Sequence, residues 1–283
     1  MGGAERHALD LASAQAEAGH RVHLIGLAGA ELRHAIPKGV TQHAMPLPLF
    51  RAVRLEALLS TLQVDVCHGH LGPACRAVAR TGVPLRVGTL HVGYKPRQHA
   101  GLDGLICVNR EQLSSLASYP GRSQVVFNWP PRPNEASPAS QSGTSGSAGA
   151  RKLRQACGLS DGRVLIGTVA RLHFSKGLDV LIQAFRRYAP GHACLVIVGE
   201  GRMKRRLREL AGGHPSIHFL GCRDDVDSIL LELDLFVSPS REEALPLVVL
   251  EAMRAGLPIV ATNTAGYANC SPAPQRRWCP PMT

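Results

Sequence analysis

The sequence predicts an α/β protein of two domains, each with a parallel sheet covered by helices on both faces. Short apolar runs alternate with helical segments along most of the chain, which is the pattern of parallel sheets. The alternation stops once, in a stretch rich in Pro, Gly and Ser, and then restarts. The length of 283 residues is enough for about two domains.

The first half opens with a helix that carries Leu9, Leu11 and Ala12 and ends near Ala18. The strands expected after it cover residues 21–27, 65–68, 85–90, 104–108 and 125–127, and the further helices cover 54–62, 73–80 and 111–117. Residues 1–130 therefore form the first predicted domain.

Residues 131–150 lack apolar periodicity and are interpreted as a linker. The second predicted domain covers residues 151–265. Its expected strands are 164–170, 193–198, 217–221, 234–237 and 257–261, and its expected helices are 178–188, 224–231 and one that begins near Pro246. The basic run from Arg202 to Arg208 is interpreted as the solvated face of another helix.

The composition describes a basic α/β protein. It is 45% hydrophobic and 4% aromatic, with a formal net charge of +11. Such a charge indicates an anionic partner, either a nucleotide, a nucleic acid or an acidic membrane surface. No motif for binding DNA or RNA is present, so we do not expect a nucleic-acid partner.

The eight cysteines include no Cys-x-x-Cys pair. Cys67, Cys107 and Cys194 lie inside apolar runs, which is typical of reduced, buried thiols in a cytoplasmic protein and not of a disulfide framework. No transmembrane helix and no signal peptide are expected.

Residues 238–262 carry the most informative pattern. Glu243 lies in a predicted loop, and Glu251 follows eight residues later on the second turn of the next helix. Leu247, Leu250 and Met253 recur at helical spacing, and Pro246 suits a helix start. Taken alone, the two acids could be solvated residues that the helix dipole favours.

This pattern resembles the Glu-x7-Glu signature of retaining glycosyltransferase family 4, also called glycosyl transferases group 1. The resemblance extends through Pro239-Ser240, Leu247-Val248, Leu250 to Met253, Gly256, Pro258 and Val260 to Thr262, with Ala244 where the family has Gly. It implies the GT-B architecture of two Rossmann-like domains, with the active site in the cleft.

The resemblance also implies site residues. Arg171 and Lys176 match the strand–Arg-x4-Lys-Gly–helix segment that holds the donor diphosphate, and His91 matches a histidine near the sugar and the acceptor. Glu243 would accept hydrogen bonds from the donor sugar, and Glu251 from the ribose. The remaining implied donor-binding residues are Gly2, Gly3, Gly199, Cys222, Arg223, Leu247 and Val248.

Three histidines, His68, His70 and His91, sit at predicted strand ends. No carboxylate accompanies them at ligand spacing, so we expect no metal site and no cofactor. Asp225 and Asp227 form an Asp-x-Asp pair at a helix start, and we interpret them as capping residues.

Relative to the family, the first strand and the C-terminal elements are expected to be missing. The chain opens in the glycine-rich loop, and residues 266–283 form a Pro-, Arg- and Cys-rich tail outside the family pattern. The implied reaction is sugar transfer from a UDP- or GDP-linked donor to a glycan or lipid-linked acceptor. An envelope polysaccharide or lipopolysaccharide, made at the inner face of the cytoplasmic membrane, fits the basic charge.

Two alternatives stay open. The chain is either an inactive, truncated fragment that binds a nucleotide sugar, or another GT-B enzyme such as a nucleotide-sugar epimerase. The Glu-x7-Glu helix together with Arg171 and Lys176 disfavours the epimerase, and no lysine motif for pyridoxal phosphate supports a phosphorylase.

Overall fold

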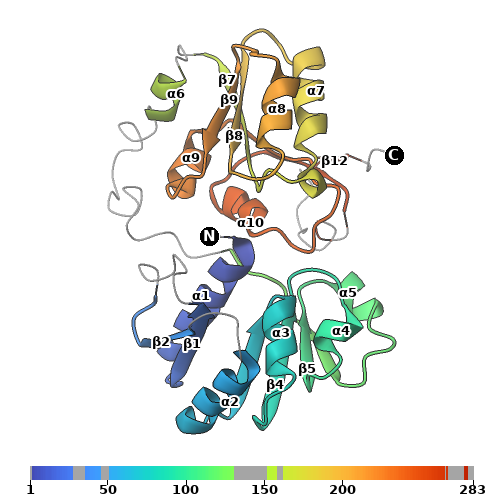
Figure 1. The fold of residues 1–283 in the computed structure, drawn as a ribbon. Coiled ribbons are helices and arrows are strands. Elements are labelled where there is room, and N and C mark those ends of the chain that lie inside the picture. Colours follow the sequence, from blue (N-terminus) through green and yellow to red (C-terminus); the bar gives the residue numbers. More distant parts are fainter. Residues whose placement is uncertain are drawn as a thin grey trace. The chain divides into compact units, whose positions relative to one another are not determined.

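The computed structural model describes residues 2–27, 36–45, 51–130, 152–157, 162–264, 266 and 277–279 (Figure 1). The chain divides into two compact units, Met1–Pro131 and Arg132–Thr283. Each unit has its own parallel strands and its own hydrophobic core, so each is described by itself.

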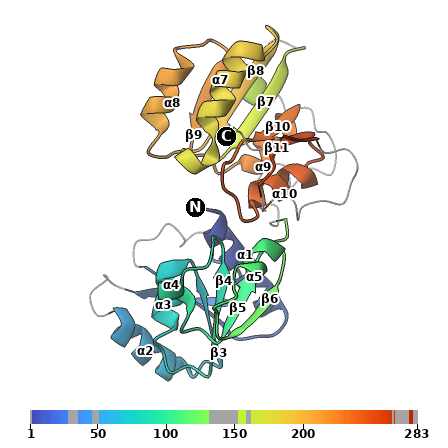
Figure 2. The same ribbon diagram turned by 90° about the vertical axis from the view of Figure 1, so that its right-hand side faces the viewer.

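The first unit contains a four-stranded sheet in the order β3-β4-β5-β6, in which all neighbours are parallel. Its strands are β3 (Val66–His70), β4 (Leu85–Leu90), β5 (Gly104–Cys107) and β6 (Arg122–Val125). A separate parallel pair consists of β1 (Val22–Leu27) and β2 (Val40–Met45). The helices are α1 (Gly3–Glu17), α2 (Arg51–Leu62), α3 (Gly72–Val78), α4 (Pro96–His99) and α5 (Arg110–Ser114) (Figure 2). Helix α1 contacts β1, β2 and β3, so it bridges the two sheets.

The core of the first unit explains where its polar residues gather. Leu90, Leu105 and Cys107 on the strands pack with Cys75 and Val78 of α3. Burial increases along β4, from exposed Leu85 to buried Leu90. The residues that follow the carboxyl ends of these strands are therefore held by a rigid core.

The second unit has a six-stranded, wholly parallel sheet in the order β12-β11-β10-β7-β8-β9. The strands are β7 (Val164–Val169), β8 (Ala193–Val198), β9 (Ile217–Gly221), β10 (Leu235–Ser238), β11 (Ile259–Thr262) and β12 (Arg277–Cys279). The helices are α6 (Lys152–Ala156), α7 (Leu178–Tyr188), α8 (Lys204–Ala211), α9 (Val226–Glu232) and α10 (Leu247–Arg254), with a 3₁₀ turn, η3 (Phe174–Lys176).

Helices cover both faces of this sheet, as predicted. All six residues of β8 are buried, which is expected for a central strand with helices on each side. One core cluster joins the sheet to α7 and α8, and the other joins it to α6, α9 and α10. The two clusters confirm the α/β fold with helices on both faces for this unit.

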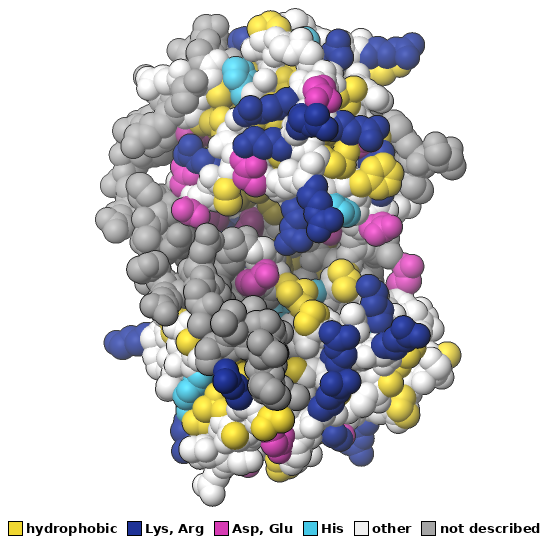
Figure 3. Space-filling view, viewed as in Figure 1, with side chains coloured by type: hydrophobic (Ala, Val, Ile, Leu, Met, Phe, Trp, Pro, Cys, Tyr) yellow, Lys and Arg dark blue, Asp and Glu magenta, His cyan; other side chains and the backbone are white. Residues whose placement is uncertain are grey.

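Helices α7 and α8 follow their sequence patterns. Leu178, Leu181, Ile182 and Phe185 are buried at the i, i+3, i+4 and i+7 positions of α7. On α8, Leu207 and Ala211 are buried, whereas the arginines between Arg202 and Arg208 are exposed. Figure 3 shows Lys and Arg side chains gathered on the face over these two helices. The basic run is thus a solvated face, as predicted.

Several elements differ from the sequence predictions. Strand β2 and helices α4 and α6 were not predicted, because each is short and lacks a clear apolar period. Strand β6 ends at Val125, where we predicted a strand to begin. Strand β12 lies within the tail that showed no periodicity, and it pairs with β11.

Helix α10 begins at Leu247, directly after Pro246, where a helix start was predicted. Leu247, Leu250 and Met253 recur at helical spacing, but the helix buries Leu247, Val249 and Ala252. Val249 and Ala252 join the core shared with α9 and the sheet, with Met253 packed against it. Apolar residues lie around most of the circumference of this helix, so the spacing of apolar residues in the sequence does not show which face is buried.

The cysteines of the described region agree with the reduced-thiol prediction. Cys67, Cys75, Cys107, Cys157, Cys194 and Cys222 are free, and of these only Cys222 is exposed. Burial raises the pKa of the Cys75 thiol to about 12 and that of Cys194 to about 11, which keeps both unreactive. None of the described helices has the length and apolar character needed to cross a membrane.

Two adjacent leucines on α9 test whether this helix packs into the core cluster that it shares with α6, α10 and the sheet. Leu230 is 1% exposed and Leu231 is 56% exposed. We expect Leu230→Ala to lower the free energy of unfolding by about 2–5 kcal/mol, because it removes buried apolar surface and leaves a cavity. Leu231→Ala should change it by about 0.5 kcal/mol or less. Urea denaturation followed by circular dichroism measures both, and equal losses would contradict the assignment.

Candidate functional site

The strand order of the second unit reverses beside β7. The chain runs from β7 outward to β8 and β9, and then crosses to β10 and β11 on the other side. In open α/β sheets, ligands bind beyond the carboxyl ends of the strands at such a reversal. The loops that follow β7 and β10, residues 170–177 and 239–246, therefore mark the candidate site of this unit.

Glycines allow these loops to pack closely. Gly177 has a φ of +62°, and a Cβ atom there would lie 1.9 Å from the carbonyl oxygen of Pro239. Gly199, at the end of β8, has a φ of +130°, and its Cβ would lie 2.0 Å from the carbonyl oxygen of Ala170. Any other residue at either position would force the backbones apart. Gly199, a predicted donor-binding residue, thus has a structural role next to the β7 loop.

A lysine and a glutamate, one from each loop, lie at the centre of the site. Lys176 Nζ is 2.5 Å from Glu243 Oε1, and Ser240 Oγ donates a hydrogen bond to the same oxygen at 2.9 Å. The Thr262 hydroxyl in turn donates to the Ser240 carbonyl. The Glu243 side chain is 11% exposed and that of Lys176 is 25% exposed, so the pair is partly shielded from water.

A second ion pair braces the same loops. Arg241 donates to both carboxylate oxygens of Asp179, at 2.8 and 2.9 Å, and its guanidinium lies 4.1 Å from the centre of the Phe174 ring. These hydrogen bonds lower the pKa of Asp179. Backbone bonds from Arg241 and Glu242 to the Ser175 carbonyl add to the connection. The position of Glu243 is therefore fixed by residues on both sides of it.

Two features beside this pair suit an anion. Arg171 follows β7, its side chain is exposed, and no described residue forms an ion pair with it. Helix α10 begins at Leu247 after the Glu243 loop, and its N-cap residue, Pro246, supplies no side-chain hydrogen bond to the first amides. A helix start with uncapped amides favours a negative group. Arg171, Leu247 and Val248 are thus available to such a ligand.

The other predicted site residues of this unit differ in their exposure and in their contacts. Glu251 lies on the second turn of α10, half-buried and engaged in contacts. Cys222 is exposed after β9. Arg223 forms a bidentate ion pair with Asp225, at 2.7 and 2.6 Å. Ala244 does not have a positive φ, so the loop here does not need the glycine found in the family.

The capping prediction is wrong for Asp225, whose side chain forms an ion pair instead. Asp225 occupies the N-cap position of α9, but its side chain makes no capping hydrogen bond there. Its carboxylate is held by Arg223 instead, and that of Asp227 lies 2.5 Å from Arg254 of α10. Charge-assisted bonds to guanidinium are stronger than bonds to a neutral amide, which explains the outcome.

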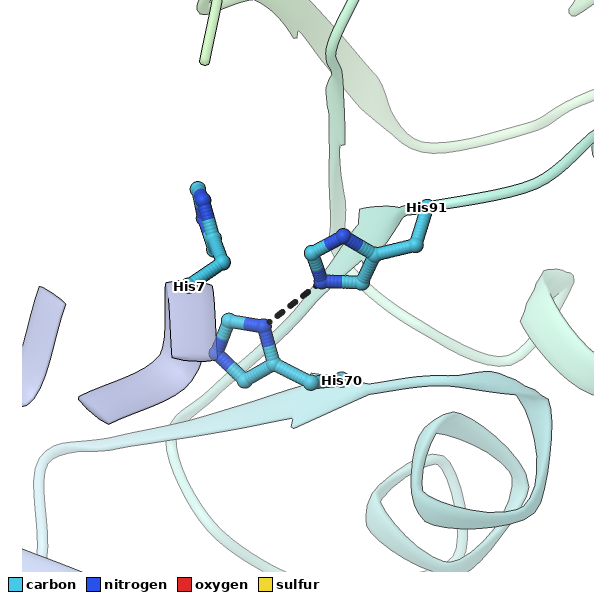
Figure 4. Close-up of side chains that lie close together, drawn as sticks. All are labelled: His7, His70 and His91. Carbon is cyan, nitrogen blue, oxygen red and sulfur yellow. Dashed lines mark hydrogen bonds between the residues drawn. The ribbon is translucent and has the colours of Figure 1, made fainter. Parts of the chain in front are cut away.

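In the first unit, histidines gather at the carboxyl ends of β3 and β4 (Figure 4). His70 Nδ1 lies 3.1 Å from Nε2 of His91, and the His68 ring lies tilted against His70 with centroids 4.3 Å apart. His7 reaches this group from α1, with ring centroids 5.0 Å from His91 and 4.6 Å from Trp129. Sequence analysis predicted His91 and noted His68 and His70, but it missed His7 and Trp129.

Burial keeps these imidazoles neutral. It lowers the pKa of His91 and of His68 to about 4 and that of His70 to about 2, with further lowering from the neighbouring imidazoles. The pKa of His7 is lowered for the same reason. At neutral pH each ring therefore has one N–H donor and one acceptor nitrogen.

The predicted glycines Gly2 and Gly3 open α1. Gly2 is its N-cap residue and Gly3 its first helical residue, with no side-chain cap on the helix. His7 follows on the second turn and is buried. A signal for His7 was present in the sequence, since a histidine on the apolar face of a helix beside a glycine-rich start is unusual, but its partners lie more than sixty residues away.

Comparisons with known proteins match each unit. Residues 1–129 match the family model described as Glycosyltransferase Family 4, and residues 163–273 match that of Glycosyl transferases group 1. The second match continues past Thr262, where we expected the resemblance to stop. The two models describe glycosyltransferase domains.

Curated relatives match a part of the chain. The O-antigen biosynthesis glycosyltransferase WclY of Escherichia coli is 30% identical over 39% of this chain and 31% of its own length. The lipopolysaccharide glucosyltransferase WaaG of Escherichia coli K12 is 31% identical over 41% of this chain and 32% of its own length. The matched region thus spans about a third of each relative.

A solved structure shows the same fold over most of the chain. Anabaena Alr3699/HepE, crystallised with UDP-glucose, aligns with a TM-score of 0.77 at 20% identity, over 96% of this chain and 80% of its own. This likeness supports the α/β fold with two Rossmann-like domains.

The histidine cluster predicts how stability depends on pH. Unfolded histidines titrate near pH 6.5, whereas His68 and His91 in the folded protein titrate at about 4. Between these values the unfolded chain binds more protons, so stability is full above about pH 6.5 and falls as the pH is lowered towards about 4. We expect a loss on the order of 2 kcal/mol or more.

Urea denaturation at a series of pH values measures this effect. His70→Gln removes one of the buried imidazoles and should flatten the profile, whereas His192→Gln, at an exposed position, should leave it unchanged. A profile that is the same in all three proteins would show that the cluster does not contribute.

Proposed function

We propose that this chain, which carries the two domains of a GT-B glycosyltransferase, transfers a sugar from a nucleoside-diphosphate donor to a glycan or lipid-linked acceptor with retained anomeric configuration. The observation that carries the proposal is the pairing of Lys176 with Glu243 at the reversal of strand order, beside the exposed Arg171. Cations and a hydroxyl-binding carboxylate are the groups that such a donor requires.

The departing nucleoside diphosphate develops negative charge that must be stabilised. Arg171 and Lys176, with the first amides of α10 at Leu247 and Val248, supply donors to that charge. Fixed donors of this kind replace a metal ion, so we propose that the transfer itself needs neither a metal nor a cofactor. Glu243 holds Lys176 in position until the donor arrives.

The two glutamates and the residues at the strand ends bind the remaining parts of the donor, which are the sugar, the ribose and the nucleobase. Glu243 accepts hydrogen bonds from the sugar and Glu251 from the ribose. The backbone near Gly199, Cys222 and Arg223 meets the nucleobase. His91 contacts the donor sugar or the acceptor. Its ring is neutral at pH 7, so it can both donate and accept a hydrogen bond. Gly2 and Gly3 provide amides at the start of α1.

The comparisons support a particular class of substrates. A neighbour in fold was crystallised with UDP-glucose, which favours a uridine donor over a guanosine donor. Two relatives are named for O-antigen and lipopolysaccharide synthesis, which favours an envelope glycan as the acceptor. The basic face over α7 and α8 suits peripheral contact with an anionic membrane surface on the cytoplasmic side.

Calorimetric titration with UDP and GDP tests the donor site. Arg171→Ala should weaken binding of the preferred nucleotide by about 10- to 100-fold, because a hydrogen bond to a charged group contributes about 1.5–3 kcal/mol. Arg205→Ala removes another exposed arginine, on α8, and should have no effect. The absence of binding to either nucleotide by a cooperatively folded chain would overturn the proposal.

Glu243 can be tested against its neighbour. Glu243→Gln keeps the size of the side chain but removes the charge that holds Lys176, so we expect transfer from the sugar donor to fall by about 10-fold or more. UDP binding should change far less. Glu242→Gln alters an exposed acid one residue away and should retain full transfer. Equal activity of the two variants would exclude a role for Glu243.

A further inference from the structure

We propose that His7, His70 and His91 form a binding site for a divalent transition-metal ion of the zinc class. One ring nitrogen from each of the three side chains lies within 4.8 Å of the other two. The residues come from α1, from the last position of β3 and from the position after β4 (Figure 4). Three separate elements therefore converge on one point, although the histidines are far apart in the sequence.

The distances suit coordination by nitrogen. Zinc binds imidazole nitrogen at about 2.0–2.1 Å, so two ligands of a tetrahedral site lie about 3.3 Å apart. His70 Nδ1 and His91 Nε2 are already 3.1 Å apart. The His7 nitrogen lies within 4.8 Å of the other two, so the His7 ring has to move closer for all three to bind one ion. Three protein ligands leave a fourth position for water or another ligand.

The chemistry of the ligand set selects the class of metal. Imidazole nitrogen binds zinc, copper, nickel and cobalt, whereas Mg²⁺ and Ca²⁺ require oxygen ligands.

Neighbouring side chains support the three rings. The His68 ring contacts His70 in a tilted arrangement, and its Nε2 is hydrogen-bonded to Thr89 Oγ1 at 2.8 Å. Trp129 lies against His7, which is 6% exposed. Such outer contacts fix the orientation of metal ligands and raise affinity.

A second histidine pair in the same unit provides a matched control. His23 Nδ1 lies 3.0 Å from His43 Nε2, between β1 and β2, but among the described residues no third ligand accompanies the pair. This pair therefore has two nitrogens at the spacing of metal ligands but lacks a third ligand among the described residues. Loss of His43 should therefore have little effect on tight metal binding.

Titration of the full chain with Zn²⁺ and Co²⁺ tests the site. We expect one ion per chain, with the visible absorption of tetrahedral Co²⁺ and no near-ultraviolet band from thiolate ligands. His7→Gln, His70→Gln and His91→Gln should each weaken Zn²⁺ binding by about 100-fold or more, and His43→Gln should leave it unchanged. Mg²⁺ and Ca²⁺ should not compete.

Circular dichroism melting identifies variants that retain the fold, and any one folded variant of the three is a sufficient test. The proposal is overturned if the unaltered chain binds Zn²⁺ no more tightly than these variants do. It is also overturned if His43→Gln causes the same loss, or if the Co²⁺ spectrum shows thiolate ligands.

A metal at this site would also affect activity, and this part of the inference rests on the proposed function. Transfer needs the His91 ring free, and a bound metal would occupy it. We therefore expect Zn²⁺ to inhibit transfer and a chelator to restore it. If the chain proves to have no transferase activity, metal binding can still be measured, so failure of one proposal does not obscure the other.

Discussion

In a parallel sheet every strand ends at the same edge, and both units of this protein place their polar residues there. In the second unit, the strand order reverses beside β7, and the loops that follow β7 and β10 lie at this reversal. In the first unit, the same geometry puts His70 and His91 next to each other at the ends of β3 and β4. The hydrophobic cores hold these edges in place, because Leu90 and Phe236, near the ends of their strands, are fully buried.

Charge is treated differently at the two edges. In the second unit, Lys176 and Glu243 neutralise each other, and Arg241 and Asp179 do the same nearby. An anionic donor of the proposed reaction would compete with Glu243 for Lys176, and until then the pair leaves neither charge uncompensated. In the first unit no carboxylate of the described residues forms an ion pair with the clustered histidines, and burial instead keeps them uncharged. The two proposals follow this difference, with an anionic donor at one edge and a hydroxyl-rich ligand or a metal at the other.

Supporting residues contribute as much to the site as those expected to touch a ligand. Ser240 shares the Glu243 oxygen with Lys176, and Gly177 allows the two loops to meet. Neither residue carries chemistry of its own that would draw attention in a sequence. Their roles appear only when the distances between separate loops are known.

The sequence alone determined the α/β class, the helices on both faces and most strands of the second unit. Strands β8 and β9 and helix α7 have the predicted bounds, because their apolar periods are long and uninterrupted. It also picked out Arg171, Lys176, Glu243 and His91 as candidates, through the motifs that resemble those of a known glycosyltransferase family. Only the tertiary structure decided which candidates meet. The Lys176–Glu243 pair joins residues 67 positions apart, and His7 joins partners from two other elements. Periodicity reports the local environment of a residue, whereas such contacts depend on strand order and loop packing, which no local pattern encodes.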